Sequence, residues 1–297
     1  MKKLVLGTAV LMSSVVWAQT DTYQVASTLG FRDYVSNTNT NTKARGLIAT
    51  SSFYFEPVAL LSNMPYFEEA SLLRNSSVRV GYYAGTYSSD TLATSDENNY
   101  SLGLTWHKND FAALVDAGGW NSTPRSATVP GNYYTRHGET LSFGLGYYLD
   151  KKSAVFLRQA IDSYSSQPHG NLVAVADGNT STTGLDFLSL IELAEGAGVV
   201  WRVGISQIRD VQYVSKDNQE IWGTVAYYFS RSLYLLGGYG QNQGNNASAE
   251  GALTTLGFGY AFAPRWAIQS KFNVFATKDS SRGNNFTDSS VYLTYRY

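Results

Sequence analysis

Several ionisable side chains of this sequence lie inside apolar runs, where each alternates with large apolar residues. Six are basic and five are acidic: Arg32, Arg79, Asp116, Arg158, Asp162, Asp186, Glu192, Arg202, Glu220, Lys271 and Arg296. Opposite charges that line an aqueous passage act on solutes by charge, without making or breaking a bond. The candidate constriction places Arg32, Arg79, Arg158 and Arg202 opposite Asp116, Asp186 and Glu192. The near balance of charge predicts weak ion selectivity, and pairing for structural satisfaction alone is the alternative.

Bond-making chemistry has little support among the three histidines. His107 lies at a short turn, and His137 and His169 lie in polar segments. His137 with Glu139 is a loose match to the His–carboxylate pair of a membrane protease, and "TWHKND" lacks the Ser–His spacing of a membrane phospholipase. With no Cys and widely separated His residues, no metal-ligand spacing appears. We therefore expect no catalytic residue, no metal and no cofactor.

The elements that must position the charged residues are runs of about ten residues with period-two alternation, the pattern of β-strands. In the run 139–149, for example, Leu141, Phe143 and Leu145 share one face. We predict about fourteen strands, within a range of 12 to 16. They are 21–34, 44–55, 76–87, 99–107, 110–120, 139–149, 153–162, 183–194, 199–208, 219–229, 232–241, 252–262, 265–276 and 287–297.

The connections between these runs alternate in length. Short turns such as "HKND" and "LDKKS" alternate with longer polar segments at 36–43, 88–98, 121–138, 163–182, 209–218, 242–251 and 277–286. Segments 121–138 and 163–182 are candidates to fold into the passage. Segment 56–74, "EPVALLSNMPYFEEASLLR", is long and apolar where a short turn is due. It is either an irregular turn, or a partial constriction or partner contact.

Composition and the N-terminus place the chain outside the cytoplasmic classes. The formal net charge of −1 offers no basic excess for a nucleic-acid partner, and charged residues are only 15% of the chain. Residues 1–18 combine "MKK", a short apolar run and Val16 and Ala18 before a cleavage site at Gln19, as in a signal peptide. A membrane anchor is the alternative, although the apolar run is short for a span of about 20 residues.

Beyond Gln19 no stretch is apolar and long enough to cross a bilayer as a helix. Strands cross lipid only as a closed barrel, because open sheet edges would leave backbone groups without partners. Charged side chains on the lipid face cost roughly 2–4 kcal/mol near the bilayer centre, so the charged groups are expected to face inward or to lie at the rims of the barrel. Residues 19–297 are therefore expected to form one transmembrane up-and-down antiparallel β-barrel, all-β in class.

Aromatic residues near the short turns are expected to form a girdle at the membrane interface. These are Tyr147, Tyr148, Tyr227, Tyr228, Phe229, Trp266, Tyr295 and Tyr297. Tyr23 is expected on the lipid face with Val25, Leu29 and Phe31. Trp120, Tyr133 and Tyr134 belong either to the girdle or to a sugar-stacking patch.

Two stretches carry a resemblance to a known family. The segment "MPYFEEASLL" and the terminal "VYLTYRY" resemble Gram-negative outer-membrane porins, in particular the general porins of gammaproteobacteria. The resemblance implies that Val291, Leu293, Tyr295 and Tyr297 present the C-terminal signal that the outer-membrane assembly machinery recognises. It also implies contact with outer-membrane lipid and lipopolysaccharide.

Together these patterns predict an exported outer-membrane porin and not an enzyme. Small hydrophilic solutes or ions are expected to diffuse passively through a water-filled lumen, with no nucleic-acid partner. Two alternatives remain: an outer-membrane barrel enzyme (protease or lipase), and a surface adhesin or receptor that acts through its loops. The solute, the preference for cations or anions and the oligomeric state are not predicted.

Overall fold

A computed structural model describes most of the chain beyond its N-terminal region. It covers residues 22–37, 41–60, 64–89, 94–124, 133–169, 177–194, 197–210, 218–244, 250–278 and 285–297. The predicted signal peptide, residues 1–18, lies outside the described residues. Within these ranges, no helix has the length and apolarity that a bilayer-crossing helix requires.

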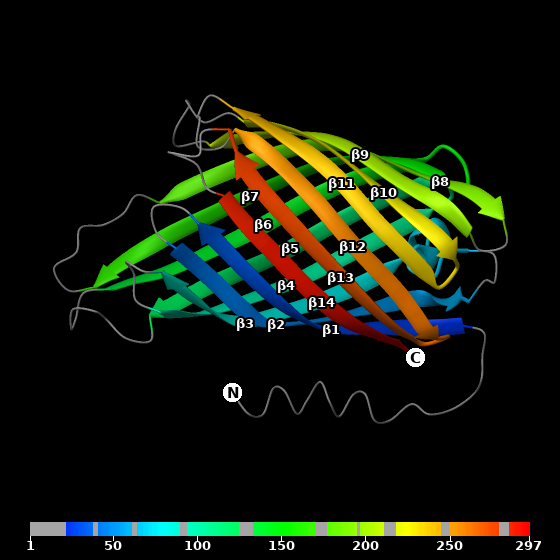
Figure 1. The fold of residues 1–297 in the computed structure, drawn as a ribbon, viewed down its shortest axis with the longest axis horizontal. Helices are drawn as coiled ribbons and strands as arrows, with labels where there is room; N and C mark the ends of the chain where they lie inside the picture. The colour runs from blue at the N-terminus through cyan, green and yellow to red at the C-terminus, as the bar shows by residue number, and fades with distance from the viewer. Residues whose placement is uncertain are drawn as a thin grey trace.

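The described residues form a closed antiparallel barrel of fourteen strands, as the sequence predicts (Figure 1). Consecutive strands are neighbours, and β1 pairs with β14 to close the sheet. The strands are β1 (Thr22–Asn37), β2 (Asn41–Ala59), β3 (Ser77–Ser89), β4 (Ser95–Lys108), β5 (Phe111–Pro124), β6 (Tyr133–Tyr148), β7 (Ser153–His169), β8 (Gly178–Ala194), β9 (Ala197–Asp210), β10 (Asn218–Ser230), β11 (Leu233–Gly244), β12 (Gly251–Ala263), β13 (Trp266–Thr277) and β14 (Asn285–Arg296). One short helix, α2 (Glu69–Leu72), follows β2.

The alternation of side chains separates the two faces of the wall. On β4, Tyr100, Leu102 and Leu104 are exposed on the outer face, whereas Ser101 and Gly103 alternate with them. The register continues this separation around the barrel: Leu102 faces Val80 and Ala117, and Gly103 faces Arg79 and Asp116. Large apolar side chains therefore cover the outside, and polar or small ones face the enclosed space, here called the lumen.

Most strands extend further than their apolar alternation predicts. Segment 88–98, for example, narrows to a connection of 90–94, and segment 121–138 narrows to 125–132. The reason is that Ser, Thr and Asn continue the hydrogen-bonded ladder after the apolar pattern ends, as in the Glu97–Ser122 and Asn98–Asn121 pairs. Residues 125–132 and 170–176, the centres of the two segments considered for folding inward, lie outside the described residues.

The seam between the first and last strands departs from the predicted pattern. The backbone N–H groups of Gln24 and Val25 both donate to the carbonyl of Tyr297, which marks a β-bulge in β1 at this seam. The pairing of β1 with β2 also shifts its register between Tyr23 and Val25. One extra residue in a strand reverses the faces that follow it. Tyr23 is therefore buried in the lumen, 5.6 Å from the ring of Tyr54. The predicted position of Tyr23 on the lipid face is therefore wrong.

The aromatic girdle is present in part. Tyr147, Tyr227, Phe229 and Trp266 are exposed on the outer face. Ring contacts continue the belt across strands, including Trp266–Tyr295 at 4.5 Å and Tyr295–Tyr297 at 5.5 Å. Tyr148 and Tyr228 are instead buried in the lumen. The prediction that Tyr148 and Tyr228 belong to the girdle is wrong. Residues adjacent along a strand face opposite sides, and their neighbours Tyr147 and Tyr227 face out.

We expect Leu102→Arg to destabilise the barrel in lipid vesicles by roughly 2–4 kcal/mol, because the guanidinium would face hydrocarbon near the middle of the apolar belt. Ser101→Arg is the matched control, since its side chain would enter the lumen. Urea unfolding followed by tryptophan fluorescence measures both. Equal destabilisation by the two substitutions would contradict the assignment of faces.

Candidate functional site

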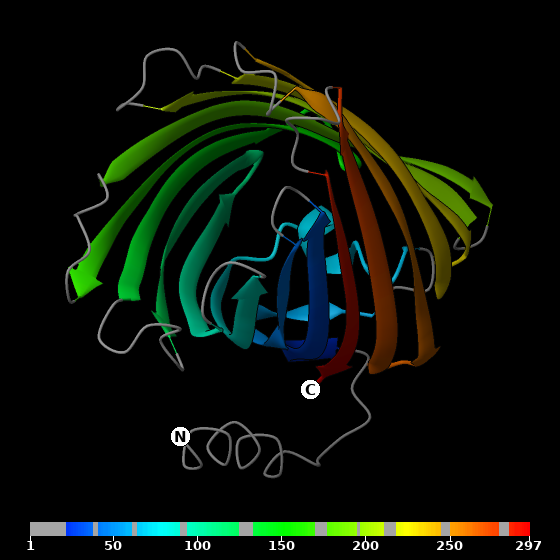
Figure 2. The ribbon, with the colours of Figure 1, turned by 60° about the vertical axis from the view of Figure 1, so that its left-hand side comes forward.

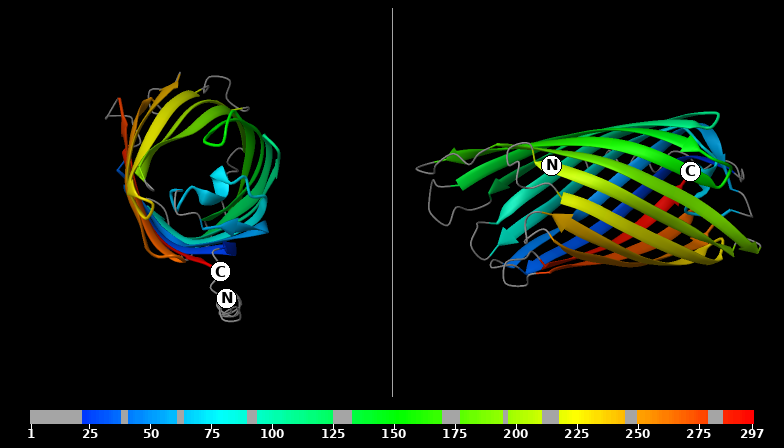
Figure 3. Two further views of the ribbon diagram at one scale, coloured as in Figure 1. Left: turned by 90° about the vertical axis from the view of Figure 1, so that its right-hand side faces the viewer. Right: turned by 90° about the horizontal axis from the view of Figure 1, so that it is seen from above.

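The connection after β2 turns back into the lumen at the end of the barrel where the short turns lie. Residues 64–74, here called the inner segment, include α2 and lie inside the ring of strands (Figures 2 and 3). The sequence left segment 56–74 open between an irregular turn and a partial constriction. The structure shows that its second half occupies part of the barrel opening.

A buried ion cluster fastens the inner segment to the last strand. Glu69 is fully buried, and its two carboxylate oxygens accept hydrogen bonds from Arg231, in the β10–β11 turn, and from Arg296 on β14, at 2.5 and 2.7 Å. Arg296 also donates to the carbonyl of Tyr66 and lies over the rings of Tyr66 and Tyr23. Burial raises the pKa of Glu69, and the two guanidinium groups oppose that rise. A buried carboxylate needs such partners, since alone it would be costly to desolvate.

The adjacent acidic residue reaches a different wall. Glu68 accepts a hydrogen bond from Arg202 on β9 at 2.7 Å and another from the hydroxyl of Tyr228 on β10 at 3.2 Å. Its side chain is only 9% exposed, whereas that of Arg202 is 45% exposed to the lumen. The Arg202 guanidinium therefore keeps donor groups accessible to a solute, while Glu68 is already occupied.

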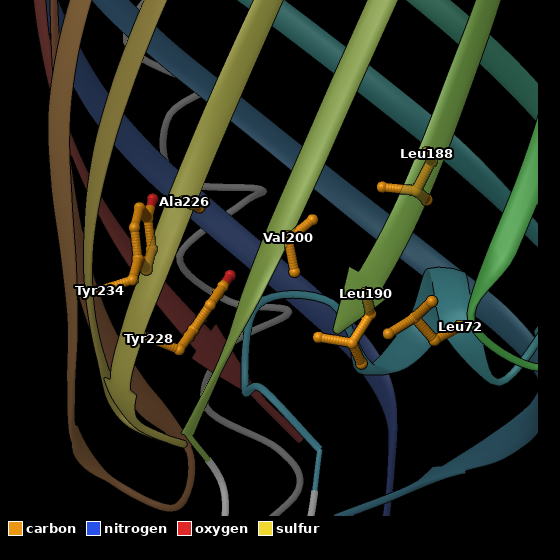
Figure 4. Close-up of a cluster of buried hydrophobic side chains, with 7 residues drawn as sticks. All are labelled: Leu72, Leu188, Leu190, Val200, Ala226, Tyr228 and Tyr234. Atoms are coloured by element: carbon orange, nitrogen blue, oxygen red, sulfur yellow. The ribbon is translucent and has the colours of Figure 1, made fainter. Parts of the chain in front are cut away.

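Apolar contacts support the same segment. Leu72 packs into a cluster with Leu188, Leu190, Val200, Ala226, Tyr228 and Tyr234 from β8 to β11 (Figure 4). Phe67 adds an edge contact with Tyr234 at 5.0 Å between ring centroids. Buried apolar area of this kind stabilises a contact without specifying its direction, so the ion pairs fix the orientation of the segment.

The far end of the inner segment reaches the opposite wall. Arg74 donates to the carbonyls of Asn109 and Asp150 in two short turns and pairs with Asp110 at 2.6 Å. The hydroxyl of Tyr148 on β6 donates to the carbonyl of Ser71 at 3.0 Å. The inner segment is thus held by β6, by β8 to β14 and by several turns, and it narrows this end of the lumen.

The structure brings together only part of the predicted constriction. Arg79 meets Asp116 at 2.6 Å and Arg158 meets Asp186 at 3.1 Å. Arg32 instead forms two hydrogen bonds with Asp288, Arg202 pairs with Glu68, and Glu192 pairs with Lys152 at the short-turn end. The expected opposition of Arg32 and Arg202 to Glu192 is therefore corrected, because the register and the inner segment supply nearer partners.

The remaining predicted charges also take definite places. Asp162 accepts a hydrogen bond from Thr140 on the neighbouring strand, and Arg296 belongs to the Glu69 cluster. Glu220 accepts a long hydrogen bond from Ser206 at 3.4 Å. Glu220 and Lys271 both line a cavity described below.

Sequence reasoning missed Glu68, Glu69, Arg231 and Asp288. The signal for the first two was present: two adjacent acidic residues in an otherwise apolar connection require nearby cations if that connection is buried. Asp288 lies in a polar stretch of β14 with weak alternation, so its face was not evident from the sequence. Arg231 lies in a two-residue turn, where a charged side chain is ordinarily solvated.

In parts of the lumen, aromatic rings lie over glycines on neighbouring strands. Trp222 covers Gly204, Trp120 covers Gly138, Tyr83 covers Gly46 and Tyr292 covers Gly30; a Cβ on any of these glycines would lie within 2.6 Å of the ring. Trp120 therefore belongs to the lumen and not to the girdle. The side chains of Tyr133 and Tyr134 lie outside the described residues.

A cavity of about 540 Å³ opens in the lumen above the inner segment. Its lining includes Phe67, Glu68, Arg202, Glu220, Trp222 and Lys271. The cavity therefore combines aromatic surface with both signs of charge, which is the composition of a site for a small polar molecule.

The two histidines whose side chains the structure describes, His107 and His137, occupy structural or exposed positions. His107 contacts the hydroxyl of Tyr148 at 3.1 Å through Nε2. His137 lies on the outer face, and both of its ring nitrogens approach the hydroxyl of Ser165, at 2.6 and 3.2 Å. Among the described residues, the ring of His137 therefore lies against Ser165. The side chain of His169 lies outside the described residues.

No protein-family model matches the chain, and no curated protein matches it. Several solved structures, however, are similar to it. Omp33 from Acinetobacter baumannii is 12% identical, with 94% of this chain and 100% of that chain covered and a TM-score of 0.55.

Two further structures are similar over most of their length. A FadL homologue from Pseudomonas aeruginosa is 9% identical, with 92% and 90% covered and a TM-score of 0.54. A mutant of the TodX monoaromatic hydrocarbon channel is 11% identical, with 93% and 90% covered and a TM-score of 0.50. At such identities the likeness shows the fold alone: this chain has the fold of bacterial outer-membrane β-barrel proteins.

We expect Glu69→Ala to lower the free energy of unfolding by about 3–5 kcal/mol, because it leaves Arg296 and Arg231 without their carboxylate partner in a buried site. Glu192→Ala is the matched control. Its pair with Lys152 is exposed, so the loss should be no more than about 1 kcal/mol. Urea titration of both variants in detergent micelles measures the difference, and similar midpoints would contradict the buried cluster.

Proposed function

We propose that this protein is an outer-membrane channel through which small hydrophilic solutes or ions diffuse passively. One observation carries the proposal: a closed barrel presents large apolar side chains outward and paired ionic side chains inward. A soluble barrel would have the reverse arrangement, with an apolar interior and a charged exterior. Lipid outside and water inside account for both faces.

The setting of the channel follows from the same arrangement. Residues 1–18 act as a cleaved signal peptide for export, and the short-turn end faces the periplasm. Val291, Leu293, Tyr295 and Tyr297 serve the outer-membrane assembly machinery, and lipopolysaccharide and lipid surround the belt. We expect transport and not catalysis, because passive diffusion through the lumen makes and breaks no bond.

The charges in the lumen favour hydrophilic solutes over hydrocarbons, for which the TodX channel is named. Arg79–Asp116, Arg158–Asp186 and Arg32–Asp288 place alternating charges along the wall. An apolar solute would have to displace water from these groups without replacing its hydrogen bonds. Paired charges act on ions of both signs, so only weak selectivity is expected.

We expect Arg79→Gln to shift the reversal potential toward cations, because Asp116 then keeps an unbalanced negative charge in the lumen. Asp116→Asn should shift it toward anions for the opposite reason. Reversal potentials in a planar bilayer with a salt gradient measure both. Arg45→Gln is the control, since Arg45 pairs with Asp33 on the outer face and should leave the potential unchanged.

If neither Arg79→Gln nor Asp116→Asn changes the reversal potential, Arg79 and Asp116 do not lie in the conducting path.

We expect replacement of residues 64–74 by a short Gly-Ser turn to raise the single-channel conductance, because the inner segment narrows one end of the lumen. Arg231 and Arg296 would then face water, so the variant does not bury their charges unpaired. Single-channel recording tests this expectation. An equal or lower conductance would show that ions do not pass beside the inner segment.

A further inference from the structure

We propose that the cavity above the inner segment is a binding site for a small zwitterion with an aromatic side chain, such as an aromatic amino acid. This inference deepens the proposed function, since it names the class of solute that the lumen retains. The cavity, at about 540 Å³, lies within the usual range of roughly 300–1,000 Å³ for small-molecule sites.

The aromatic part of the site is built from three directions. Phe67 comes from the inner segment, Trp222 and Tyr228 from β10, and Tyr234 from β11. Contacts hold the rings in place: Tyr228 lies 5.1 Å from Tyr234, Phe67 lies 5.0 Å from Tyr234, and Trp222 lies over Gly204. A fixed group of rings offers a flat side chain stacking or edge contacts at little entropic cost.

The accessible charges are of both signs. Glu68 is occupied by Arg202 and Tyr228, but the Arg202 side chain remains 45% exposed. Lys271 is exposed in the cavity lining, and the hydrogen bond that Glu220 accepts there from Ser206, among the residues that the structure describes, is long. A carboxylate therefore finds Arg202 and Lys271, and an ammonium group finds Glu220.

The charge balance separates a zwitterion from a simple ion. Two basic and two acidic residues line the cavity, namely Arg202 and Lys271 with Glu68 and Glu220, so its formal charge is zero. A ligand of one sign would leave the opposite charge of the site without a partner, whereas a zwitterion matches both.

The register keeps the two ends of the site apart. Arg202 on β9 faces Thr224 on β10, and Glu220 lies four residues further along β10. At about 3.3 Å per residue, this places their backbones roughly 13 Å apart along the strand. Trp222 lies between them on the same face of β10. Both charged groups of an aromatic amino acid lie on one carbon, so the side chains of Arg202 and Glu220 must extend toward each other across Trp222 to hold it.

The test compares four probes of one shape: L-phenylalanine, phenylacetate, 2-phenylethylamine and benzyl alcohol. We expect L-phenylalanine to interrupt the single-channel current at the lowest concentration, and the others to need at least about tenfold more. Titration calorimetry on the purified protein in detergent gives a second readout that does not depend on conduction. Equal action of phenylacetate, 2-phenylethylamine or benzyl alcohol would overturn the zwitterion assignment.

The variants locate the site. Lys271→Gln and Glu220→Gln should each weaken L-phenylalanine binding by about tenfold. Lys278→Gln and Glu250→Gln are matched controls, because this ion pair lies at the other end of the barrel. Binding that survives both cavity substitutions would overturn the inference.

The two proposals fail separately. If the protein conducts but L-phenylalanine neither blocks the current nor binds in calorimetry, the binding site is contradicted and the channel proposal stands. If L-phenylalanine binds in calorimetry but the protein never conducts, the binding site is supported and the channel proposal is contradicted.

Discussion

The pairing of every strand with two neighbours is the constraint on which the other features of this molecule depend. β1 and β14 close the ring, so the wall has no open edge whose N–H and C=O groups would lack partners. Closure divides the side chains of the strands into two sets, one on the outer face and one facing the lumen. The apolar belt, the girdle and the inward charges are all consequences of that division.

Closure also concentrates charge in a confined space, and the structure resolves this by pairing. Arg79, Arg158 and Arg32 each meet a carboxylate from a strand one or two places away. At the short-turn end, carboxylates from outside the strands join this pairing. The inner segment brings Glu68 and Glu69 to Arg202, Arg231 and Arg296, so it both narrows the lumen and balances its charge.

The candidate site was only partly predictable from the sequence. Alternation was enough to assign Arg79, Asp116, Arg158 and Asp186 to one face, because faces follow from local geometry alone. It did not identify the partners of Arg202 or Arg296. The Arg296–Glu69 contact joins residues 227 positions apart, and no local pattern carries information over that distance.

The sequence by itself determined the fourteen strands and, for most of them, which side chains face out. Alternation has a period of two in any strand, and it needs no knowledge of the neighbours. Only the tertiary structure decided the exceptions: the inward turn of Tyr23 at a bulge, the contacts of Tyr148 and Tyr228 with the inner segment, and the extension of the strands into polar sequence. These depend on the register between strands and on a segment that crosses the lumen, and both are set by contacts that form only when the barrel closes.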